Sequence, residues 1–376
     1  MNRIRRQARR EERTERLVSG ADVQKLRRHT QAQGPGHYER SERRMRIALL
    51  GPADSPYTRQ WQDFYAGRGI DVYAVSLDTH RDPAGIGRPR VRTAYLPTLR
   101  GSAVHPGAVG RLRKLLEQAR PDLVHAQFVG GYALLGALAG RHPYAVSVGV
   151  PGGDDLRGHG PAHRRMAEYV FRRADTICAT SQLTAAQIAR FTDHPVVVAP
   201  VGVDTAEFVP APRLPDGRFV IGTVGAPADV VLAAHRELLE RLGSVTAGRT
   251  DLTRIDGSVP DAELAAALAG LDVLVVTADP DGLGTDAVRA QAAGVPVVAC
   301  GVGTLTEVIR DGETGFVVPP GDSEAIASVL GRLHDDPDLR AQMGTAGRAH
   351  ALGSHSWERN ATLVLDLYAG LGNPGK

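Results

Sequence analysis

The sequence has little cysteine and no long apolar segment. Its 376 residues include two cysteines, Cys178 and Cys300, and each lies within a short apolar stretch. That placement predicts two buried thiols and argues against a disulfide or a cysteine metal site. No stretch approaches the roughly 18 apolar residues that a membrane-spanning helix requires. The first residues also lack the pattern of a signal peptide, so we expect a cytoplasmic protein.

Charge is distributed unevenly along the chain. Residues 1–44 hold 13 Lys and Arg against 6 Asp and Glu, so they carry +7, whereas the remainder carries −4 of the net +3. Because this segment has few apolar residues and no periodic apolar face, we expect a disordered basic arm. Two interpretations stay open, a tether to an anionic membrane surface and a solvated leader. The arm alone does not indicate a nucleic-acid partner.

The remaining composition is that of a globular protein with 42% hydrophobic and 23% charged residues. A chain of this length suits two α/β domains of ordinary size. Residues 46–76 alternate as strand, helix and strand, which predicts a βαβ unit at the start of the first domain.

Two strand–loop–helix units follow one another between residues 271 and 322. Residues 271–277 and 295–300 are short apolar runs rich in valine, which predicts parallel strands buried on both faces. Each run is followed by a Gly-rich loop, 278–285 and 301–307, that opens a helix. Glycines and helix N-termini at the carboxyl ends of adjacent parallel strands are typical of phosphate or nucleotide sites. Ordinary tight turns are the alternative interpretation.

The same residues resemble the donor site of the family 4 retaining glycosyltransferases, also called glycosyl transferases group 1. The resemblance is carried by four short blocks, at 281–284, 289–299, 303–307 and 312–322. It extends more weakly over about 45–372. It implies an α/β protein of the GT-B fold, in which two Rossmann-like domains face each other across a cleft. A C-terminal helix would cross back to the first domain.

On this basis we predict four segments. Residues 1–44 form the arm, 45–205 the acceptor domain, 218–350 a shortened nucleotide-sugar domain, and 351–376 the crossing helix and tail. The Pro-rich stretch 205–217 is the predicted linker.

The resemblance also implies an enzyme and its site. It implies transfer of a sugar from a nucleotide-diphosphate sugar to an acceptor, with retention and without a metal or other cofactor. The acceptor would be a sugar, a lipid or a small molecule, as in carbohydrate or natural-product biosynthesis. Asp281 and Asp154 are the predicted catalytic residues, although Asp154 equally suits a helix cap. The predicted donor-binding residues are Gly282, Leu283, Gly284, Thr285, Arg289, Gly303, Thr304 and Glu307. We expect Gly284 to lie against the donor with no room for a side chain.

Three departures from the family pattern support an alternative. Arg289 stands where the family has a carboxylate for the ribose hydroxyls, and an arginine cannot accept their hydrogen bonds. The loop after 219–224 lacks the family's diphosphate-binding Arg and Lys, and the segment before residue 271 is short. The alternative is a non-catalytic GT-B partner or binding protein. If the chain is an enzyme, Arg289 is a candidate ligand of the diphosphate.

Two further features leave alternatives open. Residues 110–119 predict a basic amphipathic helix, whose face either contacts the inner membrane surface peripherally or is simply solvated. His125, near the end of a predicted strand, is either a ligand contact or a core histidine with satisfied hydrogen bonds.

Overall fold

The computed structural model of the protein describes residues 44–82, 87–98, 106–140, 142–149, 156, 160–211, 217–225, 228–277 and 283–371. Within these ranges the chain forms two compact units. Of the described residues, those within 44–199 and 361–371 belong to the first unit and those within 200–360 to the second. Both units are parallel α/β sheets covered by helices, so the predicted fold class is confirmed. None of the described helices is both long enough and apolar enough to cross a membrane.

The first unit is built on a seven-stranded parallel sheet with the order β3-β2-β1-β4-β5-β6-β7. Its strands are short apolar runs, and the central ones are buried along their whole length. The strands are β1 Arg46–Leu50, β2 Asp71–Leu77, β3 Val91–Leu96, β4 Leu123–Gln127, β5 Tyr144–Val148, β6 Thr176–Ala179 and β7 Val196–Val198. Such runs form strands that need helices on both faces.

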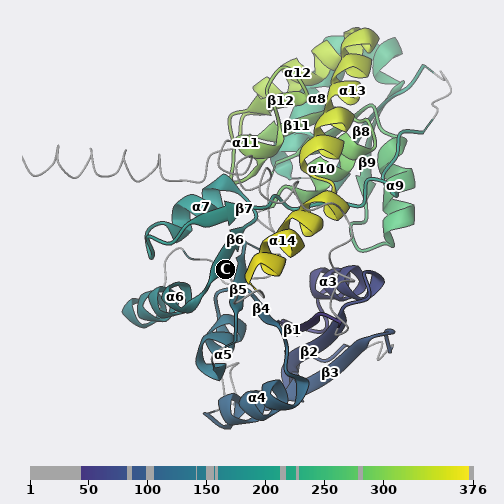
Figure 1. Cartoon of the computed structure of the whole chain (residues 1–376). Helices are drawn as coiled ribbons and strands as arrows, with labels where there is room; N and C mark the ends of the chain where they lie inside the picture. The colour runs from purple at the N-terminus through teal and green to yellow at the C-terminus, as the bar shows by residue number, and fades with distance from the viewer. Residues whose placement is uncertain are drawn as a thin grey trace, which may run out of the picture. The chain divides into compact units, whose positions relative to one another are not determined.

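The helices that cover this sheet are α3 Pro56–Gly67, α4 Pro106–Ala119, α5 Gly131–Ala139, α6 Pro161–Arg173, α7 Gln182–Ile188 and part of α14 Trp357–Leu371, with a 3₁₀ turn η2 at Asp78–His80. Ser181 accepts a hydrogen bond from the Thr184 backbone N–H at 3.0 Å and so caps α7. Helices α4, α5 and α6 lie next to one another (Figure 1), and arginines of α4 and α6 bind backbone carbonyls at the C-terminal end of α5. Arg113 donates to Leu138 O at 2.8 Å, and Arg173 donates to Gly140 O. These cations stabilise the negative end of the α5 dipole, which gives part of the basic character of α4 and α6 a structural role.

The second unit has a five-stranded parallel sheet with the order β12-β11-β10-β8-β9. Successive residues of its strands enter two different cores. Leu274 of β10 and Val297 of β11 belong to one core, whereas Val273 and Val298 belong to the other. Side chains alternate across a strand, so this sheet is buried on both faces. Its strands are β8 Phe219–Val224, β9 Thr250–Ile255, β10 Val273–Val276, β11 Val297–Cys300 and β12 Gly315–Val318.

Helices α9, α10 and α11 contribute to the first of these cores, and α8 and α12 to the second. The helices of this unit are α8 Asp229–Ala247, α9 Asp261–Ala269, α10 Thr285–Ala292, α11 Leu305–Val308, α12 Ser323–Asp335 and α13 Pro337–Ser354. Asp322 and Asp336 cap α12 and α13 through hydrogen bonds of 2.8 Å to the backbone N–H groups of Ala325 and Leu339.

The last helix, α14, has residues in both units. It begins in the second unit, and from Ala361 onward it belongs to the first. There Tyr368 packs on His125 with ring centroids 5.3 Å apart, and Thr362 accepts a hydrogen bond from Arg68 at 3.2 Å. The predicted crossing helix therefore packs against the first unit.

His125 is a core residue and not a ligand contact. Its side chain is 0% exposed, and its two ring nitrogens lie 3.1 Å from the Tyr65 hydroxyl and 2.8 Å from the Ser147 hydroxyl. Burial lowers the pKa of His125 from 6.5 to about 3. The folded chain therefore keeps this imidazole neutral.

We expect acid to weaken the first unit through this residue. Below pH 6.5 the unfolded chain binds a proton that folded His125 does not bind until about pH 3. The free energy of unfolding therefore decreases as the pH is lowered. The free energy of unfolding should decrease by about 2 kcal/mol between pH 6.5 and pH 5, at roughly 1.4 kcal/mol per pH unit. Urea unfolding at pH 7.5 and pH 5 measures this loss. His125→Gln, which is neutral at both pH values and keeps hydrogen-bonding capacity, should lose less stability over the same interval. An equal loss in both proteins would contradict the assignment.

Candidate functional site

The two Gly-rich loops of the second unit adjoin. Strands β10 and β11 pair in parallel, with Leu274 opposite Val297 and Val276 opposite Ala299, so both loops leave the same edge of the sheet. Gly284, the N-cap of α10, has φ +64°. A Cβ built on it would lie 3.1 Å from Val308 Cγ2 and 3.6 Å from Thr304 Oγ1. The start of α10 is thus packed directly against the second loop and α11.

This contact gives a reason for glycine at position 284 that the sequence prediction did not include. The sequence predicts a glycine without room for a side chain because a donor lies against it. In the structure the chain's own residues Thr304, Leu305 and Val308 also leave a Cβ at this position little room, and the predicted contact with the donor stays a prediction. The left-handed φ is a second reason for glycine at this position.

The other described donor-site residues divide into buried and accessible ones. Leu283 and the side chain of Thr304 are buried, so they anchor the two loops in the core. The Thr285 hydroxyl is also buried and has no hydrogen-bond partner within the described ranges. Gly303 has φ +56°, and Glu307 on α11 is exposed. At these loops the groups suited to bind an anion are backbone N–H groups at the start of α10, where a helix has no internal partners for them.

Three predicted residues lie outside the described residues. They are Asp281 and Gly282 of the first Gly-rich loop and Asp154 of the first unit. Their roles remain predictions from the sequence.

Arg289 is held by carboxylates. Its guanidinium donates to Asp261 Oδ1 at 3.2 Å and to Asp286 Oδ1 at 3.3 Å, and it lies 5.4 Å from the centre of the Phe208 ring. Two acidic side chains therefore already neutralise this cation. A donor diphosphate would have to compete with both of them, which weakens the prediction that Arg289 binds it directly.

Gln291 is a positioning residue that the sequence interpretation missed. It is 0% exposed on α10, and its amide nitrogen donates to Val308 O at 3.2 Å and to Thr314 Oγ1 at 3.0 Å. Thr314 Oγ1 in turn accepts from the Arg310 backbone N–H at 3.0 Å. These bonds tie α10 to the end of α11 and to the turn before β12. The available signal was a polar residue three places after Val288, on the apolar face of the helix.

Two other titratable groups lie near this edge of the sheet. Hydrogen bonds from the backbone N–H and hydroxyl of Ser258 lower the pKa of Asp256, between β9 and α9. Burial raises the pKa of Cys300 at the end of β11, so this thiol is a core group and not a nucleophile. Within the described ranges, no group of three or more His, Cys, Asp and Glu side chains is placed to hold a metal ion.

The carboxyl edge of the first unit's sheet also contains closely packed loops. Thr58 donates to Gln127 Oε1 at 2.6 Å, and a Cβ on Gly51 would lie 2.5 Å from the same oxygen. Gly149 has φ +83°, and its carbonyl accepts from the Thr180 hydroxyl at 2.6 Å. Gly51 thus leaves room for the Gln127 amide after β1, and Gly149 allows a left-handed backbone after β5.

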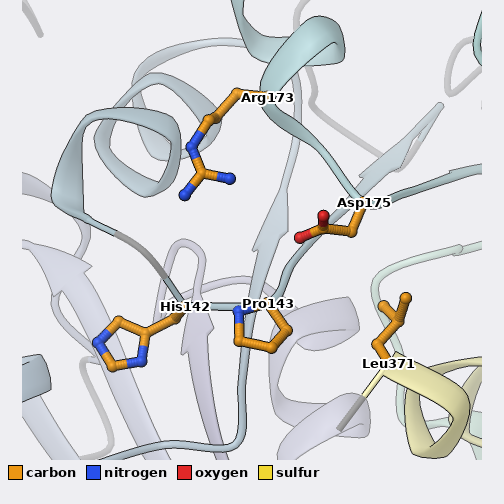
Figure 2. A pocket seen from close by; sticks show the side chains of 5 residues that line it. All are labelled: His142, Pro143, Arg173, Asp175 and Leu371. Atoms are coloured by element: carbon orange, nitrogen blue, oxygen red, sulfur yellow. The ribbon is translucent and has the colours of Figure 1, made fainter. Parts of the chain in front are cut away.

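Figure 2 shows a pocket elsewhere on the first unit, lined by His142, Pro143, Arg173, Asp175 and Leu371. Pro143 precedes β5, and Asp175 precedes β6, so the pocket lies at the amino edge of the sheet. Its two charged groups serve the fold, because Arg173 binds Gly140 O and Asp175 accepts from the Tyr144 backbone N–H at 2.8 Å. We assign it no role in the candidate site.

Comparisons with known proteins agree with the fold and the motifs. The family model "Glycosyltransferase Family 4" matches residues 57–207, and the model "Glycosyl transferases group 1" matches residues 247–350. The structure of Anabaena Alr3699/HepE in complex with UDP has a TM-score of 0.68 and 18% identity, covering 87% of this chain and 100% of that one. The fold is therefore that of the GT-B proteins. The chain belongs to the family 4, group 1 glycosyltransferases.

Two curated relatives carry the same name, D-inositol 3-phosphate glycosyltransferase. The protein from Arthrobacter sp. (strain FB24) is 28% identical over 375 residues, covering 83% of this chain and 88% of the relative. The protein from Streptomyces scabiei (strain 87.22) is 40% identical over 151 residues, covering 40% of this chain and 33% of the relative. The match thus spans about a third of the Streptomyces protein.

Proposed function

We propose that the protein transfers a sugar from a nucleotide-diphosphate sugar to an acceptor. The observation that carries this proposal is the pair of adjoining Gly-rich loops at the ends of β10 and β11. Membership of a glycosyltransferase family supports it, as do the names of the relatives. The HepE structures with UDP and with UDP-glucose support this class of donor. The non-catalytic alternative is not favoured by these relatives.

The diphosphate would be bound mainly by backbone groups. Helix α10 begins directly after Gly284, so its first N–H groups and its partial positive charge lie at the loop edge. Such fixed donors stabilise charge that develops on the leaving diphosphate. Gly282, Thr285 and Gly303 would let the donor approach the backbone. Glu307, exposed on α11, would contact the donor through its carboxylate.

The sugar and acceptor contacts come from residues predicted by the sequence. Asp281 would accept hydrogen bonds from the sugar hydroxyls and orient the anomeric carbon, and Asp154 would act on the acceptor side. We propose retention of the anomeric configuration and no requirement for a divalent metal. Product stereochemistry by NMR and activity in excess EDTA test these two points. A sugar, lipid or small-molecule acceptor stays a proposal, and so does membrane contact through the arm or residues 110–119.

Binding of nucleotide-sugars tests the proposed function. We expect at least one of UDP-, GDP- and ADP-sugars to raise the melting temperature of the full chain, because a ligand that binds only the folded state stabilises it. The same donor should then yield product with a panel of sugar and lipid acceptors. A chain that binds none of these donors at millimolar concentration would refute the transferase proposal.

A further inference from the structure

An ion-pair cluster joins the starts of α9 and α10. Arg289 donates to Asp261 at 3.2 Å and to Asp286 at 3.3 Å. Asp261 is the first residue of α9, which follows β9, and Asp286 lies in the first turn of α10, which follows β10. Because β9 and β10 both pair in parallel with β8, the two helices begin at the same edge of the sheet. The cluster therefore lies at the edge where open α/β sheets bind their ligands.

Arg289 has a fixed position within this cluster. Besides its two carboxylate partners, its guanidinium packs 5.4 Å from the ring centre of buried Phe208. Its side chain is 24% exposed. The buried Nε–H has no hydrogen-bond partner within the described ranges. A side chain held on several sides loses little further freedom when a ligand binds, so it is suited to position a neighbour.

The Asp261 carboxylate is hydrogen-bonded to Arg289 and is also accessible to solvent. Its side chain is 59% exposed, whereas that of Asp286 is 35% exposed. A carboxylate offers about four acceptor sites, and the bond to Arg289 is made by Oδ1 alone. Asp256, the neighbouring carboxylate before α9, instead accepts two hydrogen bonds from Ser258 through its Oδ1. Of Asp256, Asp261 and Asp286, Asp261 is therefore the carboxylate best placed to accept hydrogen bonds from a ligand.

We propose that Asp261, positioned by Arg289, accepts hydrogen bonds from the ribose hydroxyls of the nucleotide donor. A ribose diol donates hydrogen bonds, and hydrogen bonds to an ionised acceptor are the stronger ones. Arg289 itself cannot accept them, so it acts as a positioning residue. This inference rests on the proposed function, because it assigns the ribose part of the same donor site.

The test compares ribose and dideoxyribose ligands. Isothermal titration measures the dissociation constants of UDP, GDP and ADP and of their 2′,3′-dideoxy counterparts for the full chain. For the diphosphate that binds best, wild type should prefer the riboside by on the order of tenfold or more. Asp261→Ala should reduce this preference to about twofold or less, while affinity for the dideoxy compound stays nearly unchanged. Arg289→Gln should reduce the preference partly.

A matched control is available in the same unit. Asp251 on β9 also pairs with an arginine, Arg218, and Asp251→Ala should leave the riboside preference at the wild-type value. Equal weakening of both ligands by Asp261→Ala would assign Asp261 a structural role and overturn the inference. A wild-type protein that binds both compounds equally would also overturn it. Failure to bind any nucleoside diphosphate would instead refute the proposed function, and the inference with it.

Discussion

Asp281→Asn should lower the rate of sugar transfer by roughly 10²-fold or more, with affinity for the nucleoside diphosphate nearly unchanged. The substitution keeps the size of the side chain and removes its charge. The donor sugar is held in one orientation mainly in the transition state, so loss of a strong acceptor should appear in turnover and not in ground-state binding. In the proposed function the nucleotide is bound by other groups, at the loops around Gly284 and Gly303.

The measurement combines product formation under saturating donor with isothermal titration of the nucleoside diphosphate. Asp338→Asn provides a control, because Asp338 is an exposed carboxylate in the first turn of α13. Its transfer rate should equal that of wild type. Identical transfer rates in wild type and Asp281→Asn would show that Asp281 does not have the role that the family resemblance implies.

The sequence was sufficient to predict the strand–loop–helix order of the second unit. The valine-rich runs became β10 and β11, and Gly294 follows the end of α10 with φ +75°. Each of these features depends on residues that are close in the chain, such as a run of β-branched side chains or a glycine after a helix.

Contacts between elements could not be predicted in the same way. The partner of Arg289 on α9 lies 28 residues away in the sequence, and no spacing rule connects the two. Gln291 likewise binds Val308 and Thr314 through the folded arrangement of α10, α11 and β12. The family model of the second unit begins to match at residue 247, after the segment in which the family's diphosphate-binding cations are missing. The sequence therefore indicated which loops adjoin at this edge of the sheet, but not how the side chains around them are paired.

Gly284→Val should destabilise the second unit and weaken donor binding at least tenfold. A β-branched residue is poorly tolerated at φ +64°, and its Cβ would be pressed against Val308 Cγ2 at 3.1 Å. The left-handed backbone costs about 1–2 kcal/mol, and overpacking typically adds about 1–3 kcal/mol. Relief of this strain would move the start of α10, and with it the backbone N–H groups proposed to bind the diphosphate. Gly284→Ala should show a smaller effect in the same direction, because alanine lacks the branch at Cβ.

Urea unfolding and titration with the best-binding nucleotide-sugar measure the two effects separately. Gly331→Ala on α12 is the matched control, since a Cβ there would lie 3.8 Å from Leu238 Cδ1 of α8, an ordinary van der Waals contact. Alanine at this helical position should leave donor affinity unchanged and slightly raise stability. If Gly284→Val lowers stability but binds the donor as wild type does, the loop at Gly284 supports the fold without binding the donor. The donor site would then have to lie at another part of the carboxyl edge.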